Sequence, residues 1–182
     1  MSPLPKFRER QKQTPEEAIH DYIASHKSGI GRLVQGVFEI RTLDEAEKLS
    51  TMLANNYPMP ERAATGVWEL MSNAIEHGNL EIDHAEKARL LEKGIFNDEV
   101  ARRLTSSPYA DRLATIIFRR TKTMIRLRIA DEGKGFDYAK YLNAACPSEG
   151  PNGRGIMIAA QVSFDKVIYR RAGTMVDAIT YL

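Results

Sequence analysis

The chain has 182 residues, of which 43% are hydrophobic and 27% are charged, a composition typical of a folded globular domain. Its 26 basic and 24 acidic residues leave a formal net charge of +2, which argues against binding of a nucleic acid backbone as the main task. The single cysteine, Cys146, excludes an intrachain disulfide and favours a cytoplasmic compartment. No apolar run is long enough to span a bilayer, and the amino terminus lacks the apolar region of a secretory signal, so we expect no membrane as a partner.

Residues 1–28 contain three prolines and few large apolar side chains, so we expect a flexible leader with one helix that begins near Thr14 and Pro15. Residues 29–182 then form one domain. In chain order, apolar spacing and breakers predict a strand at 33–41, helices at 43–56 and 60–77, strands at 113–120 and 123–131, a helix at 155–162, and closing strands at 165–170 and 174–182.

The segment 80–112 differs from the rest because 13 of its 33 residues are charged. Its apolar stripes predict two short amphipathic helices broken at Gly94. In the strand at 123–131, isoleucine and leucine alternate with arginine, so one face of the sheet is expected to be buried and the other wet. Strands grouped with helices in this way predict an α+β fold, a two-layer sandwich, with a helical insertion at 80–112.

The helix at 60–77 carries a second, polar stripe of Glu69, Asn73 and His77, spaced by four residues. Asn73 can offer a neutral oxygen to Mg²⁺, and Glu69 can act as a general base on a hydroxyl or water. Taken alone, the stripe is much better explained as the solvated polar face of an amphipathic helix. We expect His77 to be structural.

The strand at 123–131 ends in D-E-G-K-G, residues 131–135. Asp131 can accept a hydrogen bond from an exocyclic amine, and Gly133 and Gly135 let the backbone approach a flat ring. A plain turn uses the same residue types.

The sequence N-G-R-G-I, residues 152–156, opens an apolar helix. Free N–H groups at a helix start, with Arg154, can hold an anion, although glycines also serve packing there. The last strand starts with Gly173 and Thr174, which by themselves indicate nothing more than a strand.

The order of these motifs is more specific than any one of them. E-L-M-S-N-A-I-E-H, D-E-G-K-G, N-G-R-G-I and a terminal G-T together resemble the N box, the two glycine boxes and the Gly-Thr of the GHKL (Bergerat-fold) ATPase superfamily, over about residues 30–182. The short chain and a lid of about 17 residues between the glycine boxes resemble most the anti-sigma factor serine/threonine kinases. The resemblance implies a Bergerat fold with a mixed sheet.

The resemblance also implies residue roles, with ATP and Mg as cofactors. Glu69 would be the catalytic base and Asn73 the Mg²⁺ ligand. Asp131 would contact the adenine amino group beside Thr174. The set expected around the nucleotide is completed by Gly133 and Gly135 at the adenine and by Gly153, Arg154, Gly155 and Ile156 at the phosphates.

Three functions follow from this resemblance as hypotheses. The first is a serine/threonine protein kinase that phosphorylates a small anti-sigma antagonist protein in bacterial signalling. The second is an ATP-dependent switch that sequesters a sigma factor or another regulator without phosphotransfer. The third is the catalytic ATPase domain of a two-component histidine kinase. A homodimer is one further option for the assembly, and the charged insertion at 80–112 departs from the compact family pattern.

Overall fold

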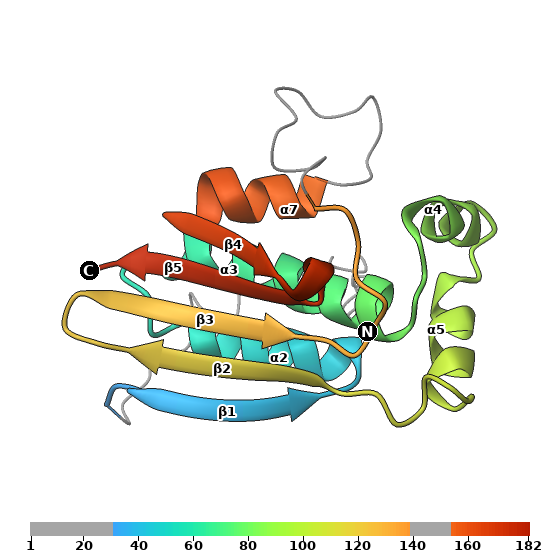
Figure 1. Cartoon of the computed structure of the whole chain (residues 1–182), viewed down its shortest axis with the longest axis horizontal. Coiled ribbons are helices and arrows are strands. Elements are labelled where there is room, and N and C mark those ends of the chain that lie inside the picture. Colours follow the sequence, from blue (N-terminus) through green and yellow to red (C-terminus); the bar gives the residue numbers. More distant parts are fainter. Residues whose placement is uncertain (1–30, 139–153) are drawn as a thin grey trace, which may run out of the picture.

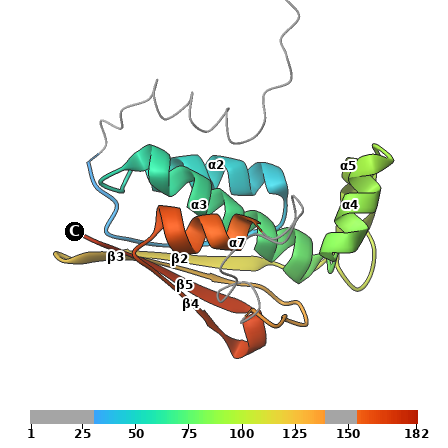
Figure 2. The ribbon, with the colours of Figure 1, turned by 90° about the horizontal axis from the view of Figure 1, so that it is seen from above.

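The structure is a computed structural model that describes residues 31–138 and 154–182, and it places helices on one face of a five-stranded sheet (Figure 1, Figure 2). The strands are β1 (Gln35–Ile40), β2 (Ala114–Arg120), β3 (Met124–Ala130), β4 (Lys166–Arg170) and β5 (Met175–Tyr181). The expected α+β two-layer architecture is confirmed. The expected leader and most of the expected lid, including Cys146, lie outside the described residues.

The strand order is β1-β2-β3-β5-β4, and all four pairings are antiparallel. The expected mixed sheet is therefore wrong for the strands that the structure describes. Within β3, Ile125, Leu127 and Ile129 are buried and the residues between them are half-buried. Period-two alternation of this kind turns one face to the helices and leaves the other to solvent.

Helix α2 (Leu43–Ala54) begins with a capping box. The Thr42 hydroxyl accepts the N–H of Glu45 at 3.2 Å, and the Glu45 carboxylate accepts the N–H of Thr42 at 2.9 Å. Hydrogen bonds from the N–H groups of Arg41 and Thr42 lower the pKa of Glu45. The helix start is therefore fixed by its own sequence.

Helix α3 (Pro60–Asn73) starts on a proline and continues into a π-helical turn, η1 (Ala74–Asn79). The Leu80 N–H donates to the carbonyl of Ile75 at 2.8 Å, a five-residue step. Single π turns are often found at functional sites. Two polar residues, Glu76 and Asn79, are buried by this turn.

Helix α7 (Arg154–Ile158) and the π turn η2 (Ala159–Ser163) pack against α3 above the sheet (Figure 2). A Cβ atom on Gly66 of α3 would lie 2.3 Å from the Cβ of Ser163, so only glycine allows this approach. Among the described helices, none has both the length and the apolar character of a bilayer-spanning segment.

The insertion contains α4 (His84–Glu92) and α5 (Phe96–Leu104), as predicted, with Gly94 between them in the left-handed region at φ +67°. Both views place these helices beyond the end of the sheet at which β3 finishes (Figure 1, Figure 2). The insertion therefore lies next to the loop at 131–135 and not over the sheet.

Candidate functional site

Glu69 and Asn73 are half-buried and lie one turn apart on α3. The Glu69 carbonyl accepts a hydrogen bond from the Ser72 hydroxyl at 3.2 Å, within the same helix. Residues four apart share a helix face, so Glu69 and Asn73 lie on the same side of α3, and their roles as base and Mg²⁺ ligand stay predictions.

Glu76 and His77, in the π turn, make polar and ring contacts with residues of the insertion. The buried Glu76 carboxylate forms an ion pair with Lys87 of α4; burial raises the pKa of Glu76, and Lys87 opposes that rise. His77 forms a hydrogen bond through Nδ1 with the Ile82 carbonyl, its ring centroid lies 4.1 Å from that of His84, and burial lowers its pKa. These contacts agree with the structural role expected for His77.

The end of the π turn contacts the loop that follows β3. A Cβ atom on Gly78 would lie 2.5 Å from Asp131 Cγ, and one on Gly133 would lie 2.3 Å from the Gly78 carbonyl oxygen. Glycine at both positions is therefore required by contact between the two segments themselves. The expected role of Gly133 beside an adenine ring stays a prediction.

Gly135 and Gly173 make a similar contact on the other side of the loop. Both have positive φ, +76° and +96°. A Cβ atom on Gly135 would lie 2.1 Å from the Ala172 carbonyl oxygen, and one on Gly173 would lie 2.7 Å from the Phe136 carbonyl oxygen. The loop at 131–136 is thus enclosed between the end of η1 and the turn between β4 and β5.

Asp131 and Thr174 lie together, as the sequence predicts. The Asp131 N–H donates to the Thr174 carbonyl at 3.0 Å, and the Asp131 carboxylate accepts the N–H of Gly133 at 2.9 Å. Burial raises the pKa of Asp131 to about 6. The Thr174 hydroxyl donates to the Arg171 carbonyl at 2.9 Å, so its lone pairs stay available as acceptors.

Three aromatic rings form a cluster, and one of them, Tyr169, interacts electrostatically with Asp131. The Tyr169 ring stacks on Tyr138, with centroids 5.3 Å apart, and meets Phe136 edge-on at 5.4 Å. Burial raises the pKa of Tyr169, and the charge of Asp131 adds to that rise. This cluster was not predicted, because its three residues come from two segments that lie far apart in the sequence.

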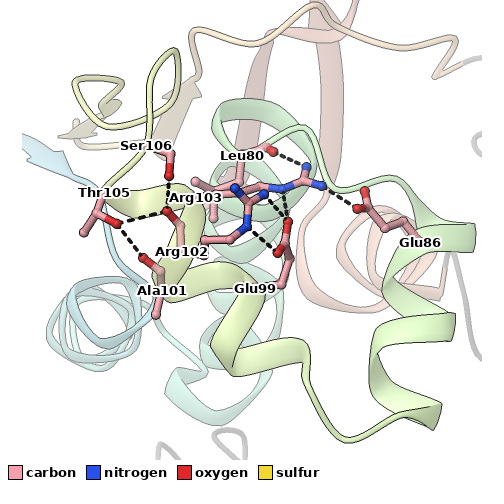
Figure 3. A network of polar contacts seen from close by, with 8 residues as sticks. All are labelled: Leu80, Glu86, Glu99, Ala101, Arg102, Arg103, Thr105 and Ser106. Carbon is pink, nitrogen blue, oxygen red and sulfur yellow. Dashed lines mark hydrogen bonds and ion pairs between the residues drawn. The ribbon is translucent and has the colours of Figure 1, made fainter.

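Arg103 on α5 connects both helices of the insertion to its first residue, Leu80. Its guanidinium donates to the Leu80 carbonyl at 2.7 Å and forms ion pairs with Glu86 and Glu99 (Figure 3). Since Arg103 is only 8% exposed, these contacts are shielded from water. Helices α4 and α5 are therefore held to the start of their own insertion.

A second arginine, Arg112, links the insertion to the site. Its guanidinium donates to the Asn79 carbonyl and to the Glu81 carboxylate, both at 2.8 Å. Glu81 also forms an ion pair with Lys134 at 2.7 Å. The predicted insertion is thus connected to the loop that carries Asp131, a link that the sequence did not reveal.

The residues expected at the phosphates are only partly described. Gly153 lies outside the described residues. Arg154 and Gly155 form the start of α7. Ile156 is 4% exposed and its side chain packs in the core. Over residues 31–138 and 154–182, no group of three or more His, Cys, Asp or Glu side chains could hold a metal ion.

Comparison with known proteins identifies one family. The histidine kinase-like ATPase domain matches residues 45–180, which is 136 of the 182 residues. The match includes the insertion and every predicted site residue. A search of curated proteins found no match.

Proposed function

The chain belongs to the histidine kinase-like ATPase domain family, a GHKL-type ATPase, and on that premise we propose that it binds ATP with Mg²⁺ and phosphorylates a small antagonist protein on serine or threonine. The observation that supports nucleotide binding best is the environment of Asp131. Its carboxylate is half-buried, burial raises its pKa, and it accepts the N–H of Gly133, so it retains acceptor capacity.

Such a carboxylate suits an amine donor from a flat base. In a desolvated setting, a hydrogen bond to a charged acceptor is stronger than one in water. Thr174, whose backbone holds Asp131, offers further acceptor capacity beside it. Adenine carries the exocyclic amine that this arrangement requires, and guanine and hypoxanthine carry a carbonyl oxygen at the same ring position.

Asn73 and Glu69 are proposed to act at the other end of the nucleotide. Mg²⁺ keeps several waters and phosphate oxygens as ligands, so one amide oxygen from Asn73 is a sufficient protein contribution. Bound Mg-ATP supplies the phosphoryl group and its charge neutralisation. Glu69 would accept the proton of the serine or threonine hydroxyl of the acceptor protein. The oxygen of that hydroxyl forms a bond to the terminal phosphorus while the bond between this phosphorus and ADP breaks. Gly153, Arg154 and Gly155 are the proposed phosphate contacts.

Phosphotransfer is tested with ATP labelled at its terminal phosphate and a lysate of the source organism as the supply of acceptor proteins. We expect an acid-stable label on a small protein, because phosphoserine and phosphothreonine survive acid. Replacement of Glu69 by glutamine should reduce this label about a hundredfold or more, since general base catalysis contributes 10²–10⁴-fold, and leave nucleotide affinity nearly unchanged.

The matched control is Glu61→Gln, an exposed glutamate in the first turn of the same helix, which should label normally. An acid-labile label would favour a histidine kinase catalytic domain. ATP-dependent capture of an unlabelled regulator would favour the sequestering switch. Equal labelling by wild type and Glu69→Gln would refute the assignment of the base.

A further inference from the structure

Asn79 is a buried polar residue that no sequence motif identifies and that contacts the loop with Asp131. It is 2% exposed, at the last position of the π turn. Its Oδ1 accepts the backbone N–H of Glu132 at 2.8 Å. Glu132 directly follows Asp131, so this hydrogen bond acts one peptide unit away from the carboxylate.

The hydrogen bond completes a set of contacts that holds Asp131 from two sides. On one side, the Asp131 N–H donates to the Thr174 carbonyl at 3.0 Å. On the other, Asn79 holds the next N–H, and Gly133 lies against the Gly78 carbonyl. Because the N–H groups of two successive residues are held by two different segments, the Asp131 side chain has little freedom to shift.

A role in packing alone does not account for an asparagine here. The Asn79 Nδ2 is buried and has no hydrogen-bond partner among the described residues. An unsatisfied buried donor lowers stability, and an apolar residue of the same size would avoid that cost. What an apolar residue would not supply is the acceptor for Glu132.

From these contacts we infer that Asn79 is the positioning residue for the base-recognising carboxylate, and that it sets how strongly the site prefers adenine. This inference rests on the proposed nucleotide binding and names a residue through which Asp131 acts. Arg112 donates to the Asn79 carbonyl, so the insertion is joined to the same residue.

The test compares dissociation constants for ATP and for inosine triphosphate, in which a carbonyl oxygen replaces the exocyclic amine. The full chain is used, with Mg²⁺, and folding is verified by circular dichroism. Wild type should prefer ATP. In Asn79→Ala the preference should fall about tenfold or to unity, because Asp131 is no longer fixed, and in Asp131→Ala it should also vanish. Adding Asn79→Ala to Asp131→Ala should change the ratio no further.

Asn79→Asp is the conservative variant, since its oxygen accepts the Glu132 N–H in either protonation state, and it should keep the ratio within about threefold. Asn55→Ala, at the end of α2, is the control asparagine. Should Asn79→Ala fail to fold, Asn79→Ser takes its place, since the shorter hydroxyl does not reach as far. A wild-type ratio in folded Asn79→Ala or Asn79→Ser, or a lost ratio in folded Asn79→Asp, overturns the inference.

Loss of nucleotide binding and loss of the role of Asn79 give different results in this experiment. Wild type that binds neither nucleotide removes the proposed function and the inference together. Wild type that prefers ATP, with variants at position 79 that prefer it equally, removes only the role of Asn79.

Discussion

The surroundings of Asp131 disfavour the ionised form of its carboxyl group. Burial raises its pKa to about 6, from an ordinary value of 3.8, while the Gly133 N–H opposes part of that rise. A group whose folded pKa is raised in this way costs stability once it ionises. The same desolvation makes the carboxylate a strong acceptor, so function and stability oppose each other at this residue.

Asp131→Asn is expected to stabilise the protein in a pH-dependent way. Below about pH 4 the carboxyl is protonated in both the folded and the unfolded state, so the variant and wild type should differ little. Between about pH 4 and pH 6 wild type loses stability relative to the variant. Above pH 6 the difference should level off at about 1–2 kcal/mol. Thermal unfolding of both proteins from pH 4 to 8 measures this; a difference that does not change with pH would contradict it.

The glycines around Asp131 show which residue-scale features the sequence can predict. The motif D-E-G-K-G predicted either a plain turn or a close approach of the backbone to a flat ring, and the structure shows a loop in which both glycines lie against other backbone segments. It could not show that Gly133 faces the Gly78 carbonyl, or that Gly135 faces Ala172, because each partner lies far away in the sequence. Asn79 was missed for the same reason: its neighbours in the chain give no sign that Glu132 is its partner.

The turn between β4 and β5 offers a matched pair of substitutions. Ala172 is exposed with φ +54°, and Gly173 is buried with φ +96°. We expect Gly173→Ala to destabilise the protein by about 2 kcal/mol or more, because the new Cβ would lie 2.7 Å from the Phe136 carbonyl oxygen. Ala172→Gly should stay within about 1 kcal/mol of wild type, since relief of strain and added unfolded-state entropy oppose each other. Urea unfolding compares the two; equal effects would contradict the packing described here.

At the scale of elements, strands and helices were predicted well where apolar periodicity is strong. The predicted strand at 123–131 is observed as Met124–Ala130, and the predicted helix at 43–56 as Leu43–Ala54. The π turn at the end of α3 was not predicted, because one extra residue in a turn barely changes the apolar spacing. The antiparallel pairing of the closing strands was also missed, since pairing depends on contacts between distant segments.

We expect the stability of the two helices of the insertion to depend on the buried side chain of Arg103. Replacing Arg103 by methionine removes the hydrogen bond to the Leu80 carbonyl and the ion pairs with Glu86 and Glu99. The two carboxylates then lack the guanidinium that they share. We expect backbone amides of α4 and α5 to exchange with solvent roughly tenfold faster or more, while the sheet is unchanged.

The adjacent Arg102 is the natural control for that experiment. It also pairs with Glu99, at 2.7 Å, but its side chain is 59% exposed. Surface pairs of this kind contribute roughly 0–1 kcal/mol, so Arg102→Met should leave exchange in the insertion nearly as in wild type. Similar exchange in both variants would show that burial of Arg103 does not hold the insertion.

At the scale of the whole molecule, the parts converge at one end of the sheet. The helix with Glu69 and Asn73 ends in the π turn, that turn contacts the Asp131 loop, and the insertion is joined to the same loop through Arg112, Glu81 and Lys134. The small net charge of +2 is therefore compatible with several buried or paired charges at this end of the molecule, among them those of Glu76, Arg103 and Arg112. A partner that binds α4 or α5 would contact a segment whose flanking residues, Glu81 and Arg112, make polar contacts with Lys134 and Asn79.

The most direct test of nucleotide binding is a calorimetric titration of the full chain with ATP in the presence of Mg²⁺. The account predicts saturable binding with one ATP per chain, competition by ADP, and little or no competition by GTP, whose base carries a carbonyl oxygen in place of the adenine amine that is proposed to donate to Asp131. A folded protein that shows no saturable heat with Mg-ATP, or that binds GTP as tightly as ATP, would contradict it.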